Sequence, residues 1–118
     1  MNDVLLQAGG AIAIFVAIVH GVLGETKIFA KAKIEPAWIK LMLRLIWQCG
    51  ALAWASLGVL LVVAPYMASP SARLWIVIVA VVNFACAALG NAWATRGRHV
   101  GWMLMALASA LAVAGLTI

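Results

Sequence analysis

The sequence predicts an all-α fold, a bundle of four transmembrane helices with both termini outside the cytoplasm. Of its 118 residues, 68% are hydrophobic and 9% are charged, the apolar residues form four runs, and most charges lie between the runs. A soluble domain carries roughly 25% charged residues, and one of this size buries only about two-thirds of its surface. Lipid is therefore the solvent that suits this composition.

The four apolar runs are 19 to 21 residues long: Val4–Gly24, Leu45–Ala64, Leu74–Ala94 and Val100–Ile118. A helix rises 1.5 Å per residue, so about 20 residues cross a hydrocarbon core of about 30 Å. The sequence thus predicts one transmembrane domain, 1–118, with helices over about residues 4–24, 37–64, 74–95 and 100–117.

The first helix is expected to remain in the protein rather than act as a cleaved signal. It opens with Asn2 and Asp3 instead of cations, and its apolar run exceeds the usual signal-peptide core of about 7–15 residues. Lysines then alternate with apolar residues over residues 26–34. This pattern indicates that the helix extends to about residue 33, into the headgroup region.

The three connections differ in character. The first contains Pro36, which is suited to the start of the second helix. The second, residues 65–73, is a Pro/Ser turn with one cation, and the third, residues 95–99, is short and basic. Together the first and third connections and their flanks carry seven cations: Lys27, Lys31, Lys33, Lys40, Arg44, Arg96 and Arg98.

This charge distribution predicts the orientation. Cytoplasmic loops carry an excess of Lys and Arg, so the first and third connections are expected in the cytoplasm and both termini in the periplasm of a bacterial inner membrane. The net charge of +5 is thereby explained by topology, and no nucleic-acid partner is expected. Tryptophans mark the two boundaries, with Trp38, Trp93 and Trp102 near the inner one and Trp75 near the outer one.

Polar residues gather at one depth. Helical rises place the following residues in the cytoplasmic third of the bundle: His20, Glu25, Arg44, Gln48 and Asn91. We expect an ion pair between Glu25 and Arg44 and a hydrogen-bonded layer of His20, Gln48 and Asn91, because an unpaired polar group in lipid is costly. The cluster is interpreted either as a clamp between helices or as a pocket for a ligand, ion or proton centred on His20.

Catalytic and metal sites are not expected. His20 is the only histidine within a helix, His99 lies in a connection, and no His-x-x-His or Cys-x-x-Cys spacing occurs. Cys49 and Cys86 are interpreted as small buried hydrophobic residues. A haem or quinone held by His20 remains an alternative.

Two further patterns concern packing. Trp47 and Trp54 are seven residues apart and share a helix face, which favours a packing role, with Asn83 as a candidate hydrogen-bond partner for Trp54. A stripe of small residues recurs at every fourth position of the first helix: Gly9, Ala13, Ala17 and Gly21. Because the fourth helix is also rich in small residues, we expect a homo-oligomer or a larger membrane complex.

The segment His20-Gly21-x-x-Gly24-Glu25, followed by Arg44-Leu45-Ile46-Trp47-Gln48 and by Arg96-Gly97-Arg98-His99, resembles a family of small bacterial four-helix inner-membrane proteins of unknown function. In that family's pattern a histidine often follows the tryptophan of the second helix, whereas this chain has Gln48. The resemblance implies the fold and a bacterial origin, and it implies no activity.

Three functions follow as hypotheses. The first is an assembly or accessory component that associates with itself or with a larger complex. The second is an oligomeric transporter of small solutes, ions or protons that uses the polar cluster. The third is a haem- or quinone-binding redox module. The first is preferred because the sequence shows neither extramembrane domains nor a charge at mid-membrane.

Overall fold

The computed structural model describes all 118 residues and confirms the all-helical prediction, since it contains no strand. Its elements are α1 (Asp3–Leu23), the π-helix η1 (Gly24–Ile28), α2 (Ala37–Val63), the 3-10 helix η2 (Ala64–Tyr66), α3 (Pro70–Thr95) and α4 (Gly101–Thr117). Three helical segments are long and apolar enough to cross a membrane, namely α1 with η1, α2 with η2, and α3. The fourth helix, α4, is shorter at 17 residues.

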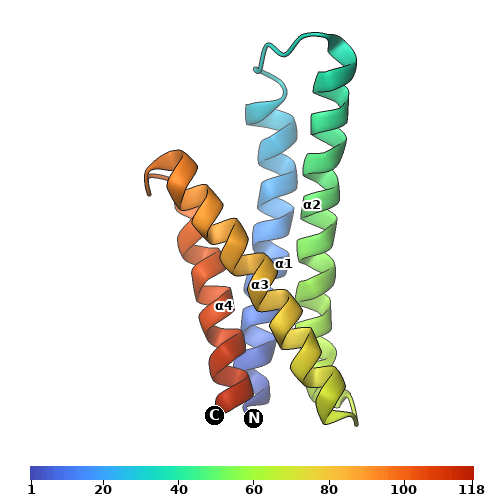
Figure 1. The fold of residues 1–118 in the computed structure, drawn as a ribbon, viewed down its shortest axis with the longest axis vertical. Coiled ribbons are helices and arrows are strands. Elements are labelled where there is room, and N and C mark those ends of the chain that lie inside the picture. The colour runs from blue at the N-terminus through green and yellow to red at the C-terminus, as the bar shows by residue number, and fades with distance from the viewer.

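Figure 1 shows α1 and α2 side by side as a long antiparallel hairpin, with α3 crossing them obliquely and α4 returning beside α1. Both termini and the α2–α3 connection lie at one end of the molecule. The backbone N–H of Asn2 donates a hydrogen bond to the carbonyl oxygen of Gly115 at 2.7 Å, which ties the two termini together. The two basic connections are directed toward the opposite end.

Helix α3 begins four residues before the expected residue 74. Its N-cap is Ser69, whose hydroxyl accepts a hydrogen bond from the backbone N–H of Ala72 at 3.3 Å, and Pro70 occupies the first turn. Both residue types are preferred at these positions because they satisfy or remove unpaired N–H groups. The helix ends at Thr95, and the positive φ angles of Arg96 (52°) and Gly97 (75°) close the turn into α4.

The first helical segment ends at Ile28, short of the expected residue 33. The backbone widens into a π-helical turn, in which the N–H of Phe29 donates to the carbonyl oxygen of Gly24, five residues earlier, at 2.8 Å. Phe29 is then buried, with its ring edge against Trp47 at a centroid distance of 5.8 Å. The inward packing of Phe29 therefore takes the place of a straight extension.

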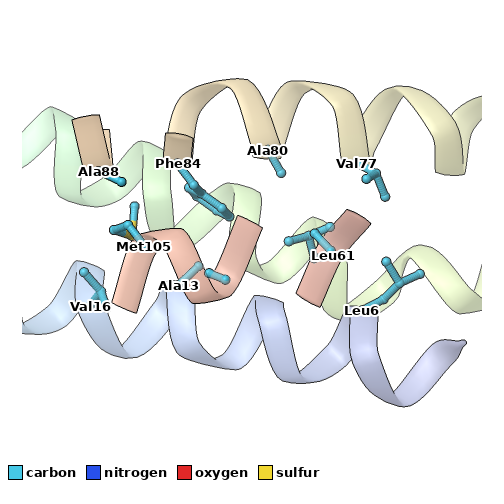
Figure 2. Packing of buried hydrophobic residues seen from close by; sticks show 11 residues of the cluster. Leu6, Ala13, Val16, Leu61, Val77, Ala80, Phe84, Ala88 and Met105 are labelled. Carbon is cyan, nitrogen blue, oxygen red and sulfur yellow. The ribbon is translucent and has the colours of Figure 1, made fainter. Parts of the chain in front are cut away.

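The core contains side chains from all four helices, as Figure 2 shows. Phe84 of α3 is fully buried, and Leu6, Ala13 and Leu61 are also inaccessible. The expected stripe on α1 divides between two environments. Gly9 packs against the backbone of α4, where an added Cβ would lie 3.0 Å from the carbonyl oxygen of Ala108, whereas the other end of the stripe borders an outer groove that is described below.

Candidate functional site

Three of the five predicted polar residues, Glu25, Arg44 and Gln48, meet where α1 passes into η1 and packs against α2. The Arg44 Nε donates to both carboxylate oxygens of Glu25, at 3.0 and 2.8 Å, and its Nη2 completes a two-pronged ion pair. The expected Glu25–Arg44 pair is therefore present. Both side chains keep contact with the surroundings, with 50% of Arg44 and 36% of Glu25 exposed.

Gln48 lies one turn from Arg44 and joins the pair to the helix backbone. Its Nε2 donates to the carbonyl oxygen of Gly21 and to Oε1 of Glu25, both at 3.0 Å. One amide group thus bridges a main-chain acceptor and the ion pair. The bond to Gly21 joins α2 to α1, and the bond to the Glu25 carboxylate is charge-assisted, which is the stronger kind.

His20 is held by aromatic rings instead of the hydrogen-bonded layer expected from the sequence. Its imidazole is stacked on Trp47, with ring centroids 4.0 Å apart and planes 5° apart, and it meets Trp54 at 4.4 Å with a tilt of 50°. Neither ring nitrogen of His20 makes a hydrogen bond within the chain. The predicted shared face of Trp47 and Trp54 is therefore the surface on which His20 packs.

The carbonyl oxygens before the π-helical turn accept bonds from side chains. Trp47 Nε1 donates to the carbonyl oxygen of His20 at 2.8 Å, and the hydroxyl of Thr26 donates to that of Val22 at 2.8 Å. Gln48 donates in the same way to the carbonyl oxygen of Gly21. The three successive carbonyl groups of residues 20, 21 and 22 thus each accept a hydrogen bond from a side chain. A π-helical turn alters the regular ladder of main-chain bonds, and such turns often occur at functional sites.

The fifth predicted residue, Asn91, belongs to a different cluster. Its Nδ2 lies 3.3 Å from Nδ1 of His99, and its buried Oδ1 has no partner. The expected layer with His20 and Gln48 is therefore not formed. The physical reason is the oblique course of α3, whose C-terminal end lies beside α4 and away from α2 in Figure 1.

His99 organises the turn between α3 and α4. The backbone N–H of Gly101 donates to Nδ1 of His99 at 3.1 Å, which makes Nδ1 an acceptor and assigns the ring proton to Nε2. The N–H of His99 in turn donates to the hydroxyl of Thr95 at 3.4 Å. Nothing in the sequence distinguishes Thr95 or predicts this role for His99, because both lie in the short predicted connection of residues 95–99, which has no recognisable pattern.

Other interpretations are also corrected. Cys49 and Cys86 are exposed on the outer faces of their helices and do not lie in the core. Asn83 donates to the carbonyl oxygen of Val79 in its own helix at 3.0 Å and does not pair with Trp54. No group of three or more His, Cys, Asp or Glu side chains is close enough to hold a metal ion.

An open groove of about 600 Å³ runs along the outer face of the α1–α2 hairpin. We call it the α1–α2 groove, and its lining includes Ala17, Gly21, Gln48, Ala51 and Ala55. Glu25 and Thr26 lie at its polar end. From Ala17 to Glu25 it spans eight residues of helix, or about 12 Å, which is most of the depth of one leaflet of a core about 30 Å thick.

Comparison with known proteins gives no match, whether to a family model, to a curated protein or to a solved structure. The resemblance noted from the sequence stays a prediction.

Proposed function

We propose that this chain is a self-associating membrane component that pairs with a second copy of itself through the α1–α2 groove. The observation that carries the proposal is the presence of a hollow and a ridge on the same face. Ala17, Ala51 and Ala55 line the hollow. The lining also includes three well-exposed apolar side chains, which we call the ridge: Ile18 (61% exposed), Val22 (56%) and Leu52 (69%).

A hollow beside a ridge is the shape that a two-fold interface needs, because such an interface is self-complementary. The ridge of one copy then fills the hollow of its partner. In lipid, helices associate through close van der Waals packing and not through exclusion of water, and small residues allow the closest approach. The groove offers small residues from two helices at once, which favours a helix as its occupant.

The proposed component crosses a bacterial inner membrane four times, with α4 as the shortest span. The orientation has the two basic connections in the cytoplasm and both termini in the periplasm. The distribution of cations supports this orientation, since seven of the eight lie in or beside the two basic connections and only Arg73 lies near the α2–α3 connection. Positive residues accumulate on the cytoplasmic side of membrane proteins.

Cysteine cross-linking tests the proposed pairing. In the proposed dimer Leu52 lies next to the two-fold axis, where a residue meets its own counterpart. Leu52→Cys, in a background carrying Cys49→Ala and Cys86→Ala, should therefore form a disulfide-linked dimer in native membranes. Leu45→Cys is the matched control, because Leu45 is 57% exposed on the same helix but does not line the groove. Equal cross-linking of both variants, or of neither, would contradict the proposed interface.

A second test fills the hollow. Ala55→Leu should shift the protein from dimer to monomer in single-molecule photobleaching of reconstituted bilayers, because the added side chain occupies the space of the partner's ridge. Ala53→Leu adds the same group to an exposed position outside the groove and should leave the dimer unchanged. A monomeric wild-type chain with lipid in the groove would reject the proposal.

A further inference from the structure

A second cavity, of about 370 Å³, lies between the α1–α2 connection and the first turns of α2. Its apolar wall consists of Phe29, Ala30, Ala37 and Leu41. Its polar groups come from Glu25, Lys40 and Arg44. Its volume lies within the range of small-molecule sites, about 300–1,000 Å³. We call it the basic pocket.

We propose that the basic pocket binds the phosphate of an anionic phospholipid, with Lys40 as its principal cation. Two cations and one carboxylate leave one net positive charge in the pocket, which matches a lipid headgroup of single negative charge. Lys40 makes no ion pair within the chain, since the pair between Arg44 and Glu25 is the only one present. The ammonium group is therefore available to an anion.

Arg44 is able to contribute without leaving Glu25. A guanidinium group carries five N–H donors, and the contacts with Glu25 use only those on Nε and Nη2. Lys40 and Arg44 are four residues apart on α2, so they share a face of the helix. A phosphate between them would accept from both and would relieve their mutual repulsion.

The position of the pocket favours a lipid over a soluble anion. Trp38, six residues before Arg44 on α2 and 64% exposed, is of the residue type that anchors helices at the headgroup level. Directly along α2, Leu41 (53% exposed) and Leu45 (57%) are one turn apart and continue from the pocket toward the middle of the membrane. An acyl chain is able to lie against these two leucines while its phosphate occupies the pocket.

Native mass spectrometry of the full chain in detergent tests the proposal with two probes, dioleoylphosphatidylglycerol and dioleoylphosphatidylcholine. We expect one phosphatidylglycerol to bind more tightly than phosphatidylcholine. Lys40→Gln should weaken that binding about fivefold, the contribution of one cation near an anionic surface. Lys33→Gln removes the same charge from the connection just before α2, at a position outside the pocket, and it should leave the affinity nearly unchanged.

Three outcomes would overturn the proposal. If Lys40→Gln and Lys33→Gln lose the same amount of affinity for phosphatidylglycerol, the lipid is attracted by the overall charge and not held at a site. If the two lipids bind equally well, the charge of the headgroup is not recognised. Displacement of phosphatidylglycerol by inorganic phosphate at similar concentration would identify a soluble anion as the ligand. The same spectra report the oligomeric state, so a failure of the proposed dimer is distinguished from a failure of lipid binding.

Discussion

The indole of Trp47 lies against the backbone of Gly24 so closely that a Cβ atom on residue 24 would come within 2.3 Å of Nε1 and 2.5 Å of Cδ1. Trp47 has little freedom to move aside. It stacks on His20, meets the edge of Phe29 and donates to the carbonyl oxygen of His20. Glycine at position 24 is therefore a condition for the aromatic packing of the site.

Gly24→Ala is expected to destabilise the protein by about 1–3 kcal/mol, the usual range for overpacking a filled site. The loss should appear as a lower thermal unfolding midpoint in detergent together with a shift of tryptophan fluorescence. Gly50→Ala is the control, because nothing lies within 4 Å of an added Cβ there. That control should keep wild-type stability or gain up to about 1 kcal/mol from helix propensity; equal effects of both variants would refute the steric argument.

The backbones of α1 and α2 approach each other closely at Gly10 and Gly58. A Cβ on Gly10 would lie 2.4 Å from the carbonyl oxygen of Gly58, and one on Gly58 would lie 2.7 Å from that of Gly10. Gly58→Ala should therefore force the two helices apart and lower the free energy of unfolding by about 1–3 kcal/mol. Gly90→Ala, in an open part of α3, should show no such loss in the same unfolding assay.

The sequence predicted the helices well because lipid imposes a simple rule, about 20 apolar residues for each crossing. It also predicted the meeting of Glu25, Arg44 and Gln48. These residues lie on helices that are consecutive and joined by a short connection, so equal depth was enough to bring them together.

Equal depth was not enough for Asn91, because the crossing angle of α3 moves its C-terminal end away from α2. Depth specifies height in the membrane but neither the rotation of a helix nor its tilt. The same limit applies to Gly10 and Gly58. Nothing in the sequence distinguishes these two from the other glycines of their helices, and only the packed structure shows that they face each other.

The Glu25–Arg44 pair should show energetic coupling. In a double-mutant cycle, Glu25→Ala and Arg44→Ala together should destabilise the chain by less than the sum of the single changes, because either change alone removes the same interaction. Both groups are partly exposed, so added salt should reduce the coupling. Thermal unfolding followed by circular dichroism measures these losses of stability. In the same measurement the losses caused by Asp3→Ala and Lys33→Ala should be additive, because these two residues form no ion pair.

The proposed orientation predicts the accessibility of single cysteines. In the background that lacks Cys49 and Cys86, Ser71→Cys should react with a membrane-impermeant maleimide in intact cells, because its connection is proposed to be periplasmic. Lys33→Cys should react only after the membrane is opened. Both positions are exposed in the folded chain, so any difference in labelling reports the side of the membrane and not burial. The reverse pattern would invert the orientation.

Replacement of His20 separates a packing role from a chemical one. Because its contacts are ring contacts, His20→Phe should keep stability close to wild type, while His20→Ala should lose the aromatic stacking, about 0.5–1.5 kcal/mol for each pair. Thermal unfolding in detergent measures both changes. If His20→Phe instead unfolds at the midpoint of His20→Ala, the imidazole nitrogens make a contribution that ring packing does not explain. If His20→Phe is as stable as wild type and also retains Leu52→Cys cross-linking, the imidazole serves as an aromatic spacer between α1 and α2, and self-association does not depend on its protonation.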